Sequence, residues 1–182
     1  PFDQDIPKNG SATVQEKILE PLKLEPEDII DDCHCLHPKY IEWSLNQSLR
    51  NLQTNSLDMY LLHNPEFSLG VFSREVWEKQ MVGCFELLEQ KAKSGILKSY
   101  GIATWQGLRV PADHAHHISL QRLIELCQEK FEPAHFRAIQ LPVNPYHREF
   151  LTLANQDKKL TVQDWAQEHQ FWVLSSAPLL QG

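Results

Sequence analysis

The chain has 182 residues, of which 42% are hydrophobic and 23% charged, and its formal net charge is −7. These values are typical of a folded globular protein, and they exclude a disordered, fibrous or collagen-like chain. The 17 basic residues are scattered and outnumbered by 24 acidic ones, so we expect no nucleic-acid partner. No apolar run approaches the roughly 18 residues of a membrane span, and the N-terminus lacks the pattern of a secretory leader. We therefore expect no membrane partner.

The first 37 residues have the least regular pattern. Residues 1–11 are rich in Pro, Asp, Asn and Gly and indicate a loop, whereas residues 13–22 have apolar side chains at four-residue spacing and predict a short helix. Pro26 stands early in an acidic segment and favours a short helical turn there. We expect residues 1–37 to be an irregular insertion or loop on a single domain that covers residues 1–182.

The segment Cys33-His34-Cys35-Leu36-His37 contains side chains that bind zinc in other proteins. Its spacing differs from the usual Cys-x2-Cys form, and no second pair of ligands follows, so we predict no metal site. The chain has four cysteines, too few and too irregularly spaced for a disulfide framework in a protein of this size. We therefore expect reduced thiols and a cytoplasmic protein.

A helix and a strand follow. Pro38 and the apolar spacing of Ile41, Leu45 and Leu49 predict an amphipathic helix over residues 39–52. Residues 57–62 form a nearly continuous apolar run, which favours a strand buried on both faces. This run stops at His63-Asn64-Pro65, three residues that are unusual inside such a strand. We expect chemistry at this end.

The alternation of strands and helices continues to the end of the chain. Residues 66–73 and 105–119 indicate loops, and further helices are predicted over residues 77–92, 120–127, 146–154 and 162–169. Gly95 suits the end of the first of these helices, and Thr161 suits the start of the last. Three more strands are predicted over residues 97–103, 136–141 and 171–175. Such alternation implies parallel strands with right-handed crossovers, in either a doubly wound sheet or a barrel.

Four segments resemble, in the right order, segments of the aldo-keto reductase family. They are residues 48–65, which end in Leu61-Leu62-His63-Asn64-Pro65; residues 85–102, which end in Ser99-Tyr100-Gly101-Ile102; Ile139-Gln140-Leu141-Pro142-Val143-Asn144-Pro145; and Val173-Leu174-Ser175-Ser176-Ala177-Pro178-Leu179. The resemblance covers roughly residues 33–182. Four ordered matches are a far more specific signal than any one of them.

The resemblance implies an α/β fold, the TIM (β/α)8 barrel, with an active site at the C-terminal ends of its strands. Residues 38–182 would supply about four parallel strand-helix units of it, since a whole barrel takes about 250 residues. The implied function is the reduction of small aldehydes or ketones by hydride transfer from NADPH, as part of a longer chain. NADH remains an alternative cofactor, and the oligomeric state is open.

For catalysis, the family uses an aspartate, a tyrosine, a lysine and a histidine, and only the histidine has a counterpart here, His63. The resemblance implies that His63 orients the substrate carbonyl and stabilises its oxygen as negative charge develops. The other three residues belong to strands expected upstream of Pro1. We expect the segment alone to be inactive.

For the cofactor, Gln140 matches the family glutamine that binds the nicotinamide carboxamide. Thr104 replaces a family asparagine, and Ala103 replaces the serine before it. Ser176, next to Ser175, stands where many members have a tyrosine that stacks on the nicotinamide, and Pro178 and Leu179 would approach the pyrophosphate through their backbone. The resemblance thus implies the cofactor-binding set Thr104, Gln140, Ser175, Ser176, Pro178 and Leu179.

Three further residues are candidates for the substrate pocket. His34 would border the pocket beside the missing lysine. Asn64 would contact ligand or instead hold the loop after His63, and Trp105 would lie beside the ligand or serve ordinary packing. Two functions stay open: a carbonyl reductase, or a noncatalytic nucleotide-binding or regulatory relative, which the changes at Ala103, Thr104 and Ser176 favour.

Overall fold

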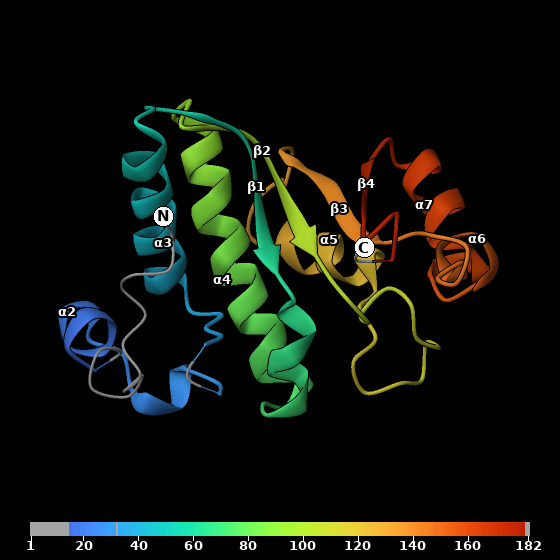
Figure 1. Cartoon of the computed structure of the whole chain (residues 1–182), viewed down its shortest axis with the longest axis horizontal. Coiled ribbons are helices and arrows are strands. Elements are labelled where there is room, and N and C mark those ends of the chain that lie inside the picture. Colours follow the sequence, from blue (N-terminus) through green and yellow to red (C-terminus); the bar gives the residue numbers. More distant parts are fainter. Residues whose placement is uncertain (1–14, 32, 181–182) are drawn as a thin grey trace.

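The computed structural model describes residues 15–31 and 33–180 and contains one parallel sheet (Figure 1). Its strands β1 (Leu57–His63), β2 (Leu97–Ala103), β3 (Phe136–Pro142) and β4 (Trp172–Ser176) lie in sequence order. A doubly wound sheet reverses its strand order at a switch point, whereas a barrel keeps it. The fold is therefore a partial (β/α)8 barrel, and the four predicted strands are confirmed.

A main helix precedes each strand along the chain. They are α3 (Pro38–Leu52), α4 (Arg74–Lys93), α5 (Leu120–Gln128) and α7 (Val162–Glu168). The hydroxyl of Thr161 accepts the amide of Asp164 at 3.1 Å, which confirms it as the N-cap of α7. Gly95 has a φ of 81° just past α4, in the region that glycine adopts without strain. No helix in the described part of the chain is long and apolar enough to cross a membrane.

The N-terminal part contains more helical structure than an irregular insertion. A π-helical turn spans Gln15–Leu19, α2 spans Glu20–Leu22, and a 3₁₀ turn spans Pro26–Asp28. Leu19, Leu24 and Cys35 form a small apolar cluster beneath these turns. The loop predicted over residues 1–11 and the start of the helix predicted over residues 13–22 lie outside the described residues.

Two local predictions were wrong. The loop expected over residues 66–73 contains a 3₁₀ helix, Pro65–Gly70, which begins at a proline whose fixed φ suits a first helical position. The helix expected over residues 146–154 is only a short α6, Glu149–Thr152. The side chain of Asn144 accepts the amides of residues 146 and 147 at 2.9 Å each, so the chain forms a turn where the helix was expected to begin.

The prediction that β1 is buried on both faces was also wrong. β1 lies at an edge of the sheet, and Leu62 is the one buried residue of this strand. Leu62 belongs to the main core, whereas Met59 and Leu61 are half-buried and His63 is exposed. An apolar run predicts a buried strand. It does not reveal that the described residues leave much of the second face of β1 uncovered.

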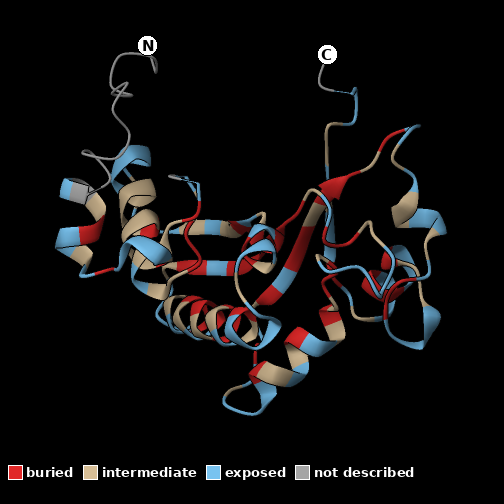
Figure 2. Cartoon of the chain, turned by 90° about the horizontal axis from the view of Figure 1, so that it is seen from below, coloured by how far each residue is buried: buried red, intermediate tan, exposed pale blue. Residues whose placement is uncertain are grey.

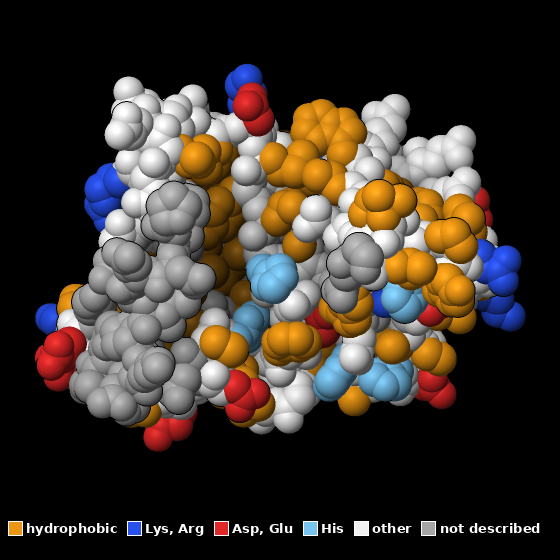
Figure 3. Space-filling model, in the orientation of Figure 1, with side chains coloured by type: hydrophobic (Ala, Val, Ile, Leu, Met, Phe, Trp, Pro, Cys, Tyr) orange, Lys and Arg blue, Asp and Glu red, His pale blue; other side chains and the backbone are white. Residues whose placement is uncertain are grey.

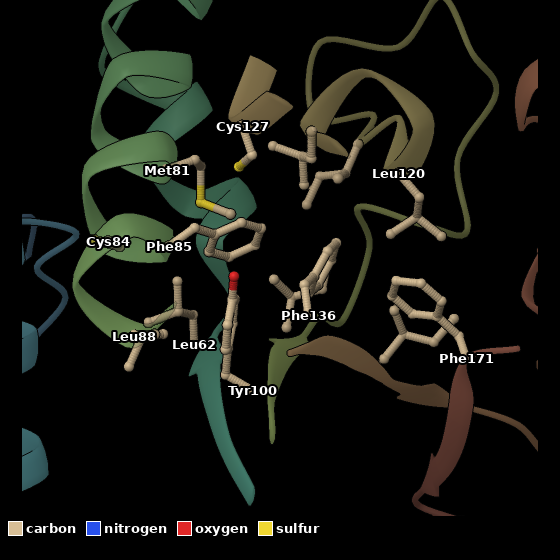
Figure 4. Packing of buried hydrophobic residues seen from close by; sticks show 14 of the residues in the cluster. Leu62, Met81, Cys84, Phe85, Leu88, Tyr100, Leu120, Cys127, Phe136 and Phe171 are labelled. Atoms are coloured by element: carbon tan, nitrogen blue, oxygen red, sulfur yellow. The ribbon is translucent and has the colours of Figure 1, made fainter. Parts of the chain in front are cut away.

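The main core lies between the sheet and the helices (Figure 2). Aromatic rings join its layers: Phe85 of α4 lies 5.2 Å from Tyr100 of β2 and 4.5 Å from Phe136 of β3, measured between ring centroids. Phe136 in turn lies 4.9 Å from Phe171 (Figure 4). Burial of these large rings stabilises the packing of α4 against β2 and β3.

Candidate functional site at the C-terminal ends of the strands

The strand register places the predicted residues on one face of the sheet. His63 pairs with Ala103, Ala103 with Gln140, and Gln140 with Leu174. Partners in a parallel sheet point to the same face, so these four residues form one row near the C-terminal ends of the strands. Ser176 pairs with Pro142, two residues beyond Gln140, and extends the same face by one layer. This face is opposite the main core.

His63 and His34 meet at a cavity. Both line a hollow of about 280 Å³ between β1 and the segment that leads into α3, together with the side chains of Tyr40, Ser44 and Tyr60 among others. Figure 3 shows histidine side chains beside a hollow with apolar side chains deeper in it. Two imidazoles above an apolar floor suit a small organic ligand with a polar group at one end.

His34 is held in place by its neighbours. Its Nε2 lies 3.2 Å from the hydroxyl of buried Ser68, and its ring meets that of Phe67 edge-on at 5.8 Å. Burial lowers the pKa of His34, the charge of Glu66 opposes this shift, and the charge of His63 adds to it. His34 is therefore neutral at pH 7 and offers the cavity a hydrogen-bonding group without a charge.

Thr104 lies in a tightly bonded segment directly after β2. Its amide donates to the Gln140 carbonyl at 2.8 Å, and its Oγ1 accepts the Gly107 amide at 2.8 Å. One carboxylate oxygen of Glu66 accepts the amides of Trp105 and Gln106 at 2.8 and 2.9 Å. Four consecutive amides, 104 to 107, are thus all engaged. The sequence did not identify Glu66, whose only signal is a charge directly after His63-Asn64-Pro65.

Asn64 and Trp105 have structural contacts. Asn64 adopts a φ of 45°, and its amide donates to the Ala103 carbonyl at 2.5 Å, which ties the end of β1 to that of β2. The Trp105 ring meets His147 edge-on at 6.1 Å. These contacts favour the loop-holding role for Asn64 and show packing for Trp105, while their contact with a ligand stays a prediction.

The predicted cofactor residues of β4 differ in orientation. Ser175 pairs with Leu141, on the opposite face from Gln140, and its hydroxyl donates to the Val143 carbonyl at 3.0 Å. Ser176 is half-buried on the same face as Gln140, and Pro178 and Leu179 are exposed. If Ser175 contacts the cofactor, it does so through its backbone.

A charged cluster joins the segments after β2 and β3. The Arg109 guanidinium donates to the Trp105 carbonyl at 3.0 Å, to Nδ1 of His147 at 2.6 Å and to the Glu149 carboxylate at 3.1 Å. Burial raises the pKa of Glu149, but its hydrogen bonds and the Arg109 charge outweigh this and lower the pKa overall. Sequence patterns gave no sign of this cluster, because Arg109 is 38 residues from His147 and 40 from Glu149.

Metal chemistry finds no support in the arrangement of ligands. Among the described residues, no group of three or more His, Cys, Asp or Glu side chains is placed to hold a metal ion. Cys33 is exposed, whereas Cys35 is buried, and burial raises the pKa of its thiol to about 11. A thiol with this pKa stays protonated and is a poor metal ligand.

Comparison with known proteins gives a consistent result. Residues 9–182 match the model of the aldo/keto reductase family. A segment of 82 residues is 27% identical to aldo-keto reductase family 1 member C21 of Mus musculus and covers 40% of this chain and 25% of that protein. The chain therefore spans about a quarter of that curated relative's length.

Solved structures show the same fold. The crystal structure of Gox0644 in its apo form matches with a TM-score of 0.52 at 21% identity, over 85% of this chain and 44% of that one. An aldo/keto reductase from Klebsiella pneumoniae in complex with NADP and acetate matches with a TM-score of 0.51 at 19% identity, over 80% of this chain and 41% of that one. The chain spans less than half the length of these structures.

Proposed function

The chain belongs to the aldo/keto reductase family, and on this basis we propose that it supplies the histidine side of a site that reduces small aldehydes or ketones with NADPH, within a barrel that other strands complete. The observation that carries the proposal is the row His63–Ala103–Gln140. It presents an imidazole and a side-chain amide on one face, at the ends of adjacent strands.

The residues present fit a nicotinamide group. The side chain of Gln140 is half-buried, and no described residue hydrogen-bonds to it. A primary amide both donates and accepts, which matches a carboxamide. Thr104 bonds to Gln140 through its backbone amide, and Ser176 lies one layer further along the same face, where its side chain would add a contact at the same end. When bound, the reduced nicotinamide supplies the hydride.

The position of His63 supports a role toward the substrate. It is exposed at the end of β1 and lines the cavity that we propose for the carbonyl compound. An N–H of its imidazole would donate to the carbonyl oxygen, hold it in position and stabilise the negative charge that develops there. His34, across the same cavity, would contact the rest of the substrate.

A second candidate function is nucleotide binding without catalysis. It is favoured by Ala103, which stands in the middle of the row and offers no hydrogen bond, and by the Thr104 oxygen, which already accepts the Gly107 amide. Both features reduce the number of polar groups available to a carboxamide. They leave His63 and Gln140 in place.

The test is a titration with NADPH followed by quenching of tryptophan fluorescence. We expect saturable binding that Gln140→Leu weakens by about tenfold, equivalent to roughly 1.4 kcal/mol, because the side chain keeps its size and loses its hydrogen bonds. Gln128→Leu is the matched control, since Gln128 is an exposed residue at the end of α5. Equal affinities of the two variants, or no binding at all, would contradict the proposal.

The two candidate functions are separated by adding aldehydes to the NADPH complex of the complete barrel. Consumption of NADPH that His63→Ala abolishes supports the reductase. Saturable binding without consumption, across a panel of aliphatic and aromatic aldehydes, supports the noncatalytic relative and contradicts the reductase.

A further inference from the structure

The hydroxyl of Ser68 determines which ring nitrogen of His34 carries the proton. This serine is fully buried, and its hydroxyl oxygen lies 3.2 Å from His34 Nε2, the one hydrogen-bond partner that it has among the described residues. The oxygen of Glu66 that lacks a partner, two residues earlier in the chain, does not accept from it. Because a buried hydroxyl needs an acceptor for its proton, the Ser68 hydroxyl donates and His34 Nε2 accepts.

The proton of His34 is therefore on Nδ1. Burial lowers the pKa of this imidazole, so the ring is neutral at pH 7, and a neutral imidazole has one N–H and one acceptor nitrogen. Nε2 is the acceptor, and Nδ1 has no partner among the described residues. The ring lines the cavity of about 280 Å³ that His63 also lines. The cavity thus has a second imidazole, with an N–H donor that no described residue uses.

The ring of His34 is also fixed in position. The amide of His34 donates to the Ile30 carbonyl at 3.0 Å, and its carbonyl accepts the Ile30 amide at 2.7 Å, so the backbone is held on both sides. The Phe67 ring meets the imidazole edge-on at 5.8 Å. Phe67 and Ser68 both belong to the 3₁₀ helix Pro65–Gly70, which follows β1. The donor is therefore preorganised, which lowers the entropic cost of binding to it.

We propose that His34 donates its Nδ1–H to a second oxygen of the substrate, while His63 donates to the oxygen of the reacting carbonyl. Ser68 is then a positioning residue, which holds His34 in this tautomer and does not line the cavity itself. The proposal rests on the proposed function and adds a second contact to it. It favours hydroxy and dicarbonyl compounds over alkyl aldehydes and ketones, because a substrate without the second oxygen leaves the donor unpaired.

The first test observes the tautomer directly. The chain is labelled with nitrogen-15 in its histidine rings, and NMR spectra are recorded at about pH 8, where imidazoles are neutral. The signal of a ring nitrogen differs between its protonated and unprotonated forms, and His34→Asn assigns the signals of His34. We expect the proton on Nδ1 in the original chain. In Ser68→Ala, Nε2 loses its donor, and we expect a mixture of both tautomers.

Ser99→Ala is the matched control for this substitution. Ser99 is another buried serine, and its hydroxyl donates to the Asp58 carbonyl at 2.8 Å within the sheet. Both variants lose one buried hydrogen bond, but Ser99→Ala should leave the signals of His34 unchanged. A proton on Nε2 in the original chain would overturn the proposal. So would equal spectra of His34 in Ser68→Ala and the original chain.

The second test compares ketones that differ in one oxygen. The pairs are hydroxyacetone with butan-2-one, and 4-hydroxybutan-2-one with pentan-2-one, so that two spacings of the second oxygen are sampled at equal ligand size. Binding to the chain is followed by the backbone NMR signals of Tyr60 and Leu61, which line the cavity. We expect the hydroxy ketone of at least one pair to bind about fivefold more tightly, the effect of one hydrogen bond.

Variants of His34 show whether this preference comes from its donor. His34→Leu should abolish the preference, because leucine has no hydrogen-bonding group. His34→Asn should keep it, since the side-chain amide also supplies an N–H. Ser68→Ala should reduce the preference, and Ser99→Ala should preserve it. Equal affinities within both pairs, or a preference that persists in His34→Leu, would refute the role of His34.

Failure of the proposed function has a different signature. If no ketone shifts the signals of the cavity saturably, or if His63→Ala leaves every affinity unchanged, the carbonyl site at His63 is refuted, and the role of His34 falls with it. If His63→Ala weakens the binding of all four ketones while the two members of each pair bind equally to the original chain, only the roles of His34 and Ser68 are refuted.

Discussion

At the scale of single residues, the sequence indicated side chains at the ends of the strands. It missed the side chains that hydrogen-bond to the segments after those strands. His63 was noticed because it ends an apolar run, whereas Thr104 and Gln140 were predicted from the resemblance to the family. Glu66 acts on amides 39 and 40 residues away, and no local pattern encodes such a contact. Side-chain hydrogen bonds across the fold therefore had to come from the structure.

The buried histidine His117 gives a prediction on pH dependence. It lies in the segment predicted as a loop over residues 105–119, yet it is buried, and its Nε2 lies 2.8 Å from the Asn155 carbonyl. Burial lowers its pKa from 6.5, the hydrogen bond to Asn155 opposes this, and the charges of Arg74 and His114 add to it.

Because the pKa of His117 is lower in the folded chain than in the unfolded one, its contribution to stability is present above pH 6.5 and is lost as the pH falls through the folded-state pKa. We expect the free energy of unfolding, from urea titrations between about pH 7.5 and about pH 5, to fall less in His117→Gln than in the original chain. Parallel pH profiles would contradict this assignment.

At the scale of elements, periodicity predicted the strands and long helices because each buries one regular stripe or face. α3, α4, α5 and α7 and all four strands lie within a few residues of the expected ranges. The short elements were less predictable. Pro65–Gly70 and α6 depend on a single proline and on the side chain of Asn144, and such local effects are weak in a sequence pattern.

The contact between β2 and β3 gives a prediction on stability. A Cβ at Gly101 would lie 1.9 Å from the Ala138 carbonyl oxygen, where the register between these strands shifts. Backbone atoms cannot yield as a flexible side chain does, so we expect Gly101→Ala to lower the free energy of unfolding by at least about 3 kcal/mol in urea titration.

Gly70→Ala is the control for this substitution. A Cβ at Gly70 meets only the side-chain Nε2 of His116, at 3.5 Å, an ordinary contact. We expect a change within about 0.5 kcal/mol. Similar losses in the two variants would show that the close approach of β2 and β3 does not determine the stability of the sheet.

At the scale of the whole molecule, four ordered matches predicted the family and the barrel, and the strand order and the family comparison confirmed them. The sequence could not reveal that side chains on one face of the sheet are exposed to solvent. Trp172 of β4, on the face of Gln140, is 57% exposed. Burial on that face depends on contacts with elements that these residues do not supply.

The central claim is that the face bearing His63 and Gln140 binds the nicotinamide end of a dinucleotide. Its most direct test is a titration of the isotope-labelled chain with NADPH, followed by the NMR signals of backbone and side-chain amides. We predict saturable shifts at His63, Thr104 and Ser176 and at the side-chain amide of Gln140. No saturable shift, or shifts confined to the helix-covered face and the N-terminal ends of the strands, would contradict the account.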